Sequence, residues 1–360
     1  MKICFLAPAN SAHIVKWCGY FVSQGHEVHV VSFTRGDLAG TTVHFVDCGA
    51  DAESSDRKKL NYLLKSGKVR KLVKQIHPDI INAHYATSYG TVAALAGLKN
   101  YIVSVWGSDI YDFPNKSPLH KALLEFSLRK APHLFSTSQA MADEAAKYTK
   151  KHFEITPFGV DTDLFSPDKR DRADRDFVIG TVKALSYKYG IDYLLRAAAI
   201  VRKEHPEIPL RVRIAGKGPD EAAFKQIADD LQISDIVTWL GFISQEQAAK
   251  EWANMDLAVV SSSSSSSESF GVSAVEAQAC ACPIIVSDVP GLMEATKPGE
   301  TSVVVPRKNE RALANTIFDL YINEKKRFDY GEQGRRFVID NYEYRRCFEK
   351  IENLFYCIRK

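Results

Sequence analysis

Apolar and polar residues alternate along the first part of the chain in the order strand, helix, strand. Short apolar runs predict buried strands at residues 2–8, 26–33, 79–84 and 101–107. Apolar residues at three- and four-residue spacing predict helices at residues 13–25, 60–76 and 88–98. Strands that alternate with helices indicate a parallel sheet that is covered on both faces.

The same pattern starts again after a charged, proline-containing segment at residues 164–176, which we interpret as a linker. Further strands are predicted at residues 176–185, 210–216, 237–243, 257–261 and 283–287. Helices predicted at residues 191–204 and 220–232 separate the first three of these strands. The pattern predicts an α/β protein with two Rossmann-like, doubly wound domains that face a central cleft. Ligands of such sheets bind beyond the carboxyl ends of the strands.

The domain boundaries follow from this repeat. We expect a first domain at residues 1–165 and a second domain at residues 166–342. A last helix is expected at residues 343–360, after both sheets are complete. Its apolar side chains recur at helical spacing, so we expect this helix to pack back across the domains. These side chains are Tyr344, Phe348, Ile351, Leu354, Phe355 and Ile358.

Composition excludes several classes of protein. A length of 360 residues favours two domains over one, and a net charge of +3 does not indicate a nucleic-acid-binding protein. No segment approaches the roughly 18 apolar residues that a membrane span needs, and the start MKICFLAPAN indicates a buried strand rather than a signal peptide. The seven cysteines form no C-x-x-C pair, which favours free thiols in a reducing, cytoplasmic location.

The stretch ESFGVSAVE, at residues 268–276, carries two glutamates on either side of a Phe-Gly turn. A helix is predicted at residues 274–281, and a serine just before it can cap it. The start of a helix offers unpaired N–H groups to a phosphate, and Gly271 lets the backbone approach a ligand closely. A carboxylate at each end suits a nucleoside diphosphate sugar, because sugar and ribose hydroxyls flank its phosphates. The alternative is that both glutamates lie on the surface.

This stretch resembles the signature of the retaining glycosyltransferases of family four (group 1), which have the GT-B fold. The resemblance extends over nearly the whole chain. PFGVDTDLF is similar to the family's entry to the second domain, with Phe158 in place of the usual asparagine. The segments GTVKALSYKYGIDYLLRA, RIAGKGPDEAAF and VTWLGFIS are similar to three further family motifs, in family order.

The resemblance implies roles for the donor-site residues. Glu276 is expected to bind the ribose hydroxyls, and Glu268 is expected to bind hydroxyls of the transferred sugar. The backbone N–H groups expected at the diphosphate belong to Phe270, Gly271 and Val272. The residues expected at the base are Gly241, Phe242 and Ile243, and Gly216 lies in the family's G-x-G-P turn.

The family places an arginine and a lysine at the leaving diphosphate, where two cations stabilise developing charge. This chain has no arginine there. Lys183 and Lys188 are the nearest cations, and ungapped alignment places Ala184 and Tyr189 at the two family positions. We favour a shift of one residue that brings both lysines to the diphosphate. The alternative is that they are solvated surface lysines.

The first domain departs from the family pattern. Where many relatives have the pattern H-G-x-D, this chain has WGSD, so Trp106 replaces the histidine while Gly107 and Asp109 remain. The change removes a hydrogen-bonding partner for the donor sugar. His84, at the carboxyl end of a predicted strand, is a candidate to supply a polar contact in the cleft. The alternative for His84 is a structural role.

The resemblance implies a hexosyltransferase-type enzyme with a nucleotide-sugar donor, expected to be a UDP-sugar, and a glycan or lipid-linked acceptor. It implies that the first domain binds the acceptor and that the second domain binds the nucleotide sugar. Cell-envelope or exopolysaccharide synthesis is the expected context. No cofactor is expected and no metal, because the sequence has neither a D-x-D motif between apolar strand residues nor a His/Cys cluster. A nucleotide-sugar epimerase of the same fold and a non-catalytic partner subunit are the alternatives. Hydrolysis of a nucleotide sugar by the purified protein would separate these functions.

Residues 57–77 contain eight Lys or Arg residues and no acidic residue, with apolar residues at roughly helical spacing. A basic amphipathic helix of this kind can lie on an anionic membrane surface. We therefore expect a possible peripheral location on the inner face of the membrane. The alternative, which does not exclude the first, is an ordinary helix that packs on the sheet and has a solvated basic face.

Overall fold

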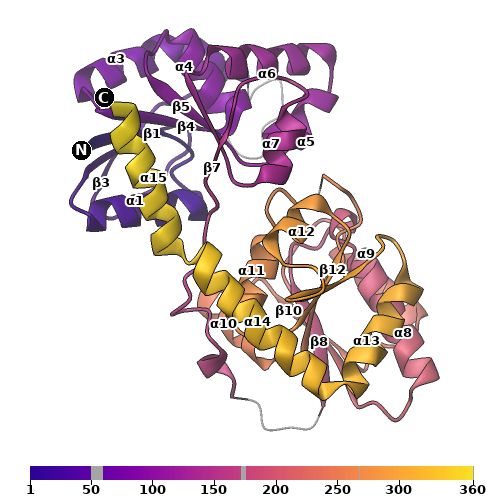
Figure 1. Ribbon diagram of the computed structural model, residues 1–360. Coiled ribbons are helices and arrows are strands. Elements are labelled where there is room, and N and C mark those ends of the chain that lie inside the picture. Colours follow the sequence, from indigo (N-terminus) through magenta and orange to yellow (C-terminus); the bar gives the residue numbers. More distant parts are fainter. Residues whose placement is uncertain (50–59, 172–175, 267, 360) are drawn as a thin grey trace. The chain divides into compact units, whose positions relative to one another are not determined.

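The computed structural model describes residues 1–49, 60–171, 176–266 and 268–359. Parts of three sequence predictions lie outside these ranges: residues 57–59 of the basic segment, 172–175 of the linker, and residue 360 of the last helix. Ser267, the last residue of a run of seven serines at residues 261–267, also lies outside them. The chain forms two compact units, which are coloured along the sequence in Figure 1. Unit 1 contains Met1–Phe158 and Cys347–Lys360, and unit 2 contains Gly159–Arg346. The first boundary thus lies at residue 158, and the chain returns to unit 1 within its last helix.

Unit 1 is built on a parallel sheet, which over its described residues has seven strands in the order β3-β2-β1-β4-β5-β6-β7. The strands are β1 (Lys2–Leu6), β2 (Glu27–Ser32), β3 (Thr41–Phe45), β4 (Ile80–His84), β5 (Tyr101–Val105), β6 (His133–Ser136) and β7 (Glu154–Ile155). The α-helices are α1 (Ala12–Ser23), α3 (Ser66–Ile76), α4 (Thr91–Leu95), α5 (Ser108–Tyr111), α6 (Pro118–Lys130), α7 (Gln139–Ala145) and α15 (Tyr344–Arg359). Shorter turns of other helix types are η1 (Leu60–Lys65), η2 (Tyr85–Gly90) and η3 (Phe113–Asn115).

Unit 2 repeats this architecture. Its parallel sheet has six strands over the described residues, in the order β10-β9-β8-β11-β12-β13. The strands are β8 (Phe177–Val182), β9 (Leu210–Ala215), β10 (Val237–Gly241), β11 (Leu257–Val260), β12 (Ile284–Ser287) and β13 (Ser302–Val305). The α-helices are α8 (Ile191–Glu204), α9 (Glu221–Asp230), α10 (Gln245–Asn254), α11 (Val272–Ala279), α12 (Pro290–Ala295), α13 (Glu310–Ile322) and α14 (Glu324–Tyr342). Two 3-10 turns are η4 (Pro167–Lys169) and η5 (Tyr187–Tyr189).

The apolar patterns explain these layers. The central strands β4, β5, β11 and β12 are buried along their whole length, as expected for a sheet covered on both faces. Among the described residues, apolar clusters in unit 1 and in unit 2 fill space between the sheets and their helices. In the described part of the chain, no helix combines the length and the apolar character needed to cross a membrane.

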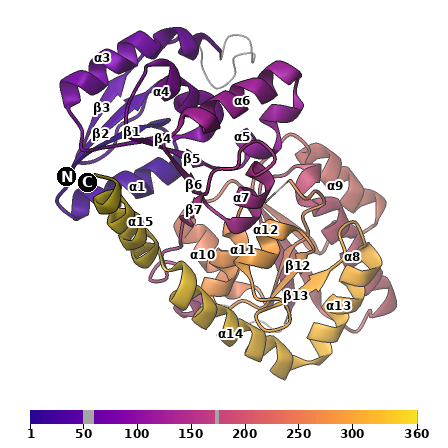
Figure 2. The same cartoon turned by 45° about the horizontal axis from the view of Figure 1, so that its top comes forward.

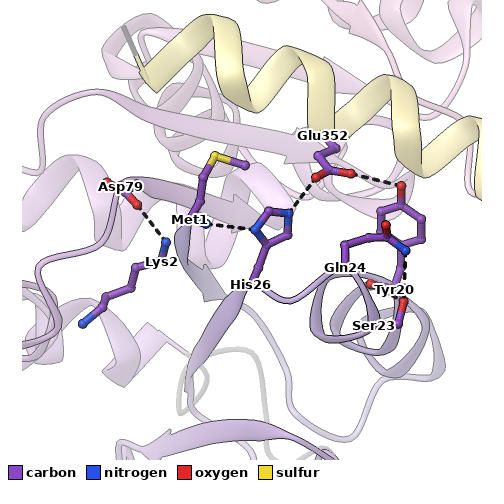
Figure 3. Close-up of polar contacts among 8 residues, drawn as sticks. All are labelled: Met1, Lys2, Tyr20, Ser23, Gln24, His26, Asp79 and Glu352. Atoms are coloured by element: carbon purple, nitrogen blue, oxygen red, sulfur yellow. Dashed lines mark hydrogen bonds and ion pairs between the residues drawn. The ribbon is translucent and has the colours of Figure 1, made fainter.

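The last helix, α15, packs against α1, as both ribbon views show (Figures 1 and 2). Its apolar stripe carries this contact: Phe348 meets the Trp17 ring edge-on, and Phe355 stacks on Phe21 at 5.3 Å between ring centroids. A polar network adds to it at one side (Figure 3). Glu352 Oε1 lies 2.7 Å from His26 Nε2, and Glu352 Oε2 accepts a hydrogen bond from the Tyr20 hydroxyl at 3.1 Å. Glu352 thus links α15 to α1 and to His26 within unit 1.

The carboxyl end of β4 lies in an aromatic cluster. His84 is fully buried, with its ring 4.8 Å from Trp17 and 4.7 Å from Trp106, both edge to face. Neither ring nitrogen has a hydrogen-bond partner among the described residues. Burial, helped by the nearby His13, lowers the pKa of His84 from 6.5 to about 3, so the ring is neutral at physiological pH.

We predict that Glu352→Ala destabilises unit 1 by about 1–3 kcal/mol, because hydrogen bonds to a charged group are lost at a mostly buried site. Urea unfolding followed by circular dichroism measures this change. Glu349→Ala, at an exposed position of the same helix, is the matched control and should be near neutral. Equal unfolding free energies for the two variants would contradict the proposed role of Glu352.

The pKa of His84 gives a second prediction. Between pH 6.5 and 3 the unfolded chain binds a proton at His84 that the folded protein does not bind. Stability should therefore fall as the pH falls, by up to about 1.4 kcal/mol per pH unit from this group. In His84→Phe, urea unfolding at several pH values should show a shallower slope than in the wild type. The control is His152→Phe, which changes an exposed histidine and should keep the wild-type slope. A wild-type slope in His84→Phe would contradict the lowered pKa of His84.

Candidate functional site

The donor-site residues predicted from the sequence gather at one edge of unit 2. Strands β10, β9, β8 and β11 are neighbours in the sheet, and all run in the same direction. Their carboxyl ends therefore lie side by side. The residues that follow these ends include Gly216 after β9, Lys183 after β8, and the serine run with Glu268 after β11. In parallel sheets this edge is where ligands bind.

A buried ion pair lies at the centre of this edge. Lys183 Nζ is 2.7 Å from Glu268 Oε1 and donates a hydrogen bond to Oε2 at 2.9 Å. The two side chains are only 13% and 5% exposed. The Ser262 hydroxyl donates a second hydrogen bond to Glu268 Oε1 at 2.8 Å. The structure thus joins Lys183 and Glu268, two residues that the sequence analysis proposed separately.

The second predicted cation lies close by. Lys183 Nζ is 4.7 Å from the centre of the Tyr189 ring, and Lys188 Nζ is 5.0 Å from the same ring. Both ammonium groups therefore face one aromatic ring, a favourable cation–π arrangement. Lys188 is exposed. Ala184, which ungapped alignment placed at one of the two family positions, has no charge and cannot serve as the cation. The loop thus brings the two lysines together around Tyr189.

The serine run connects two loops. Ser261 Oγ donates to Gly190 O and Ser263 Oγ donates to Tyr187 O, both at 2.8 Å. The Ser263 N–H group donates to Lys188 O at 2.9 Å. The first three serines therefore fix the loop that carries Lys188 and position Glu268. This role was not predicted, although the run's place directly after a strand was the available signal.

Helix α11 begins two residues earlier than predicted, at Val272, and its N-cap is Gly271. Gly271 has φ of 74°, which favours glycine, and an added Cβ would lie 2.9 Å from Leu292. The expected serine cap is therefore wrong, because Ser273 lies inside the first turn and donates to Val182 O at 3.1 Å. Ala274 N–H donates to Gly271 O at 2.9 Å, while the N–H groups of Val272 and Ser273, which precede it in the first turn, are suited to an anion.

Backbone hydrogen bonds connect the turn after β9 with the end of β10 and with the residue after β8. Gly216 N–H donates to Gly241 O at 2.7 Å, and Lys183 N–H donates to Ala215 O at 2.8 Å. Gly216 has φ of 135°, and an added Cβ would lie 1.9 Å from Lys183 O, so only glycine fits there. The Phe242 side chain is 78% exposed, while Ile243 packs partly against the core.

The remaining predicted donor residues lie on α11 and directly before it. Glu276 lies half-buried on α11, just over one turn from the start of the helix. Phe270 is buried against Tyr342, so its backbone rather than its ring is available to a ligand.

His84 and Asp109 belong to unit 1, not to this edge. Asp109 is buried and accepts three backbone N–H groups, those of Ala86, Trp106 and Gly107, at 2.8–3.1 Å. Burial nevertheless raises the pKa of the Asp109 carboxyl. His84 is enclosed by aromatic rings, which favours the structural alternative for this residue over direct contact with a ligand.

Metal ligands do not cluster in the described ranges. Among residues 1–49, 60–171, 176–266 and 268–359, no group of three or more His, Cys, Asp or Glu side chains is placed to hold a metal ion. Metal independence itself stays a prediction.

Family models match both parts of the chain. Residues 2–138 match the model described as "Glycosyl transferase 4-like", and residues 164–337 match "Glycosyl transferases group 1". The D-inositol 3-phosphate glycosyltransferase of Pseudarthrobacter chlorophenolicus is 28% identical over 284 residues, which are 70% of this chain and 64% of that protein. The chain thus spans slightly less than two thirds of this relative's length. The N-acetyl-alpha-D-glucosaminyl L-malate synthase of Bacillus anthracis is 23% identical over 92% of this chain and 90% of its own length.

Solved structures share the fold. Sucrose-phosphate synthase from Thermosynechococcus elongatus superposes with a TM-score of 0.84 at 18% identity, covering 99% of each chain. The Anabaena protein HepE, in complex with UDP and glucose, superposes with a TM-score of 0.80 at 18% identity and covers 99% of this chain and 100% of its own. The two family models lie in chain order over the two units, and the fold agrees with them. The chain therefore belongs to the family four, or group 1, glycosyltransferases and has the GT-B fold.

Proposed function

We propose that the protein is a retaining glycosyltransferase that uses a UDP-sugar as donor and a hydroxyl group of a glycan or lipid-linked molecule as acceptor. The pathway that we propose is cell-envelope or exopolysaccharide synthesis. The observation that carries the proposal is the buried pair of Lys183 and Glu268, with Lys188 close by and the first turn of α11 following in the chain.

The charges and donors at this edge suit the parts of a nucleotide sugar. Two ammonium groups and the N–H groups at a helix start can bind a diphosphate. Glu268 is fixed by Lys183 and Ser262, so its carboxylate is oriented to accept hydrogen bonds from sugar hydroxyls. Glu276, further along α11, would accept hydrogen bonds from ribose hydroxyls. The donor would thus lie along the carboxyl edge from β8 to α11.

The proposed reaction needs no nucleophile from the protein. The bond between the sugar C1 and the diphosphate oxygen breaks, and a bond from C1 to the acceptor oxygen forms on the same face. The proton of the acceptor hydroxyl passes to the departing diphosphate, so the products are the glycoside and the nucleoside diphosphate. Lys183 and Lys188 would stabilise the negative charge that develops on the diphosphate.

The choice of uridine draws on the structural neighbours. The Anabaena protein HepE has been solved with UDP and with UDP-glucose, and the pneumococcal O-GlcNAc transferase with UDP. A different donor is named for a GDP-mannose-dependent mannosyltransferase of Mycolicibacterium smegmatis, which is 27% identical over 56% of this chain. Donor hydrolysis by the purified protein, measured with UDP-, GDP- and ADP-sugars with and without chelator, tests the donor and the need for a metal. Activity lost with chelator and restored by manganese would contradict metal independence.

The basic helix suits a membrane-linked acceptor. Val69, Val73 and Ile76 of α3 pack into the core of unit 1, so this helix has the ordinary packing that was one alternative. Its basic side chains Lys68, Arg70, Lys71 and Lys74 are exposed. Leu64, in η1 and two residues before the helix, is 82% exposed. A basic face next to an exposed leucine can bind an anionic lipid surface, with about 1 kcal/mol from each basic residue.

Glu276→Ala should weaken the binding of UDP, because the ribose hydroxyls lose an acceptor. Glu268→Ala should reduce turnover more than UDP affinity, because its proposed partner is the sugar. Isothermal titration calorimetry with UDP and a donor-hydrolysis assay measure the two effects. Glu207→Ala, an exposed position just before β9 at the opposite edge of the sheet, is the control.

Two results would count against these assignments. Unchanged UDP affinity in Glu276→Ala would show that Glu276 does not bind the ribose. Equal loss of UDP affinity in Glu268→Ala and Glu276→Ala would show that the two roles are wrongly divided.

The protein should sediment with vesicles that contain anionic lipid, and added salt should release it. It should not sediment with neutral vesicles. Changing four basic residues to glutamine should abolish the binding while circular dichroism stays unchanged. These residues are Lys65, Lys68, Arg70 and Lys71.

A matched control removes the same charge elsewhere in unit 1, by changing four exposed lysines to glutamine. These are Lys121, Lys130, Lys147 and Lys150. This variant should still bind anionic vesicles. Equal sedimentation with neutral and anionic vesicles, or equal loss in both variants, would argue against docking through α3.

A further inference from the structure

The aromatic ring of Tyr189 faces both lysines of the proposed donor site. The ring centre lies 4.7 Å from Lys183 Nζ and 5.0 Å from Lys188 Nζ. Lys183 directly follows β8, whereas Lys188 and Tyr189 belong to the 3-10 turn η5. The negative face of an aromatic ring attracts an ammonium group that lies within about 6 Å of its centre. One side chain, to which the sequence analysis gave no role, thus attracts both cations.

The two lysines differ in what else holds them. The Lys183 ammonium group is bound by the buried carboxylate of Glu268, and the Lys183 side chain is only 13% exposed. The Lys188 side chain is exposed, and within the described ranges its ammonium group has neither an ion pair nor a hydrogen bond. An exposed lysine side chain without further contacts samples many rotamers. The Tyr189 ring is therefore the contact that limits where the Lys188 ammonium group lies.

Backbone contacts fix the loop around Tyr189 without help from its ring. The Tyr189 N–H group donates to Ser186 O at 2.9 Å. The next residue, Gly190, has φ of 69°, and an added Cβ would lie 1.9 Å from Ser261 O. The Ser261 hydroxyl in turn donates to Gly190 O at 2.8 Å. Replacing the ring should therefore leave the loop in place and change only what the ring contacts.

An aromatic ring suits a pair of cations that has to bind an anion. Two ammonium groups close together repel each other, and this repulsion grows where water is excluded. A carboxylate between them would hold them more strongly, but it would also neutralise charge that a diphosphate needs. The face of a neutral ring attracts both ammonium groups and leaves their charge available.

We propose that Tyr189 is a positioning residue, whose ring holds the Lys183 and Lys188 ammonium groups where both reach the diphosphate of the donor. The inference rests on the proposed function, because that function assigns the two lysines to the departing diphosphate. Tyr189 acts through the lysines and touches no reacting atom. Its ring, and not its hydroxyl group, carries the effect. Phenylalanine should therefore replace Tyr189, whereas an aliphatic residue should not.

Donor hydrolysis by Tyr189→Leu and Tyr189→Phe tests the role of the ring. The substrate is the UDP-, GDP- or ADP-sugar that the wild type hydrolyses fastest. Negative charge develops on the diphosphate as it departs, so misplaced lysines should lower kcat more than they raise KM. We expect kcat to fall at least about tenfold in Tyr189→Leu and to stay within about twofold of the wild type in Tyr189→Phe.

The matched control is Tyr187→Leu, which removes another aromatic ring from the same turn. The Tyr187 ring packs on Phe224, with 4.9 Å between the ring centroids. This variant should keep the wild-type kcat, and the circular dichroism of all three variants should match that of the wild type.

A double-variant cycle shows whether Tyr189 acts through Lys188. If the ring positions this lysine, its removal should cost less in Lys188→Ala than in the wild type. The effects of Tyr189→Leu and Lys188→Ala on kcat should therefore be less than additive in free energy. Full additivity would mean that the ring and the lysine act independently, which would overturn the inference.

Binding of inorganic pyrophosphate, measured by calorimetry, separates the inference from the proposed function. Pyrophosphate offers the lysines a diphosphate without a sugar or a base. Tyr189→Leu should bind it at least about tenfold more weakly than the wild type, which is about 1.4 kcal/mol, and Tyr189→Phe should bind it as the wild type does. This pattern in a protein that hydrolyses no donor would contradict the proposed function and support the inference.

Two further results overturn the inference. One is a wild-type kcat and a wild-type pyrophosphate affinity in Tyr189→Leu, which would leave the proposed function intact. The other is an equal loss in Tyr189→Phe and Tyr189→Leu, which would show that the hydroxyl group contacts the substrate directly. Neither pyrophosphate binding nor donor turnover in the wild type would overturn both the inference and the proposed function.

Discussion

A buried negative charge has to be compensated, and this constraint organises both units of the protein. In unit 2, Glu268 is almost fully buried, and Lys183 and Ser262 satisfy its carboxylate. Removing one member of a buried ion pair typically costs about 3–5 kcal/mol, so the loops that carry the partners must come together for unit 2 to be stable. The same requirement places a cation and an oriented carboxylate beside the first turn of a helix. Stability and the proposed donor site therefore depend on the same contact.

In unit 1, backbone N–H groups rather than a cation compensate the buried carboxylate of Asp109. Asp109 has three backbone N–H groups as partners, and burial raises the pKa of its carboxyl. Hydrogen bonds from the backbone orient loops, whereas a lysine partner places a cation beside the carboxylate, where a substrate can share it. This difference fits the proposal that unit 2 binds a charged donor. The arrangement of the two units, and the cleft expected between them, stays a prediction.

The sequence predicted the parts of the fold that depend on local pattern. Apolar periodicity located the strands and most helices, because burial on a sheet requires that spacing. The pairing of Lys183 with Glu268 could not be predicted, since the residues are 85 positions apart and only the folded sheet brings them together. The same holds for the serine run, whose hydroxyl groups act on a loop more than 70 residues earlier. The start of α11 was misplaced because Gly271 in its left-handed conformation, and not a serine, caps the helix.

The central claim is that the carboxyl edge of unit 2 uses Lys183 and Lys188 to stabilise the leaving diphosphate. Donor turnover in Lys183→Ala and Lys188→Ala, compared with the exposed control Lys203→Ala, tests this claim most directly. Lys188 is exposed and lies outside the buried pair, so its loss affects the rate without the folding cost that accompanies loss of Lys183. The account predicts that each of the first two variants lowers the rate more than about tenfold, equivalent to about 1.4 kcal/mol on the barrier, while the control keeps the wild-type rate. A wild-type rate in Lys188→Ala would contradict it.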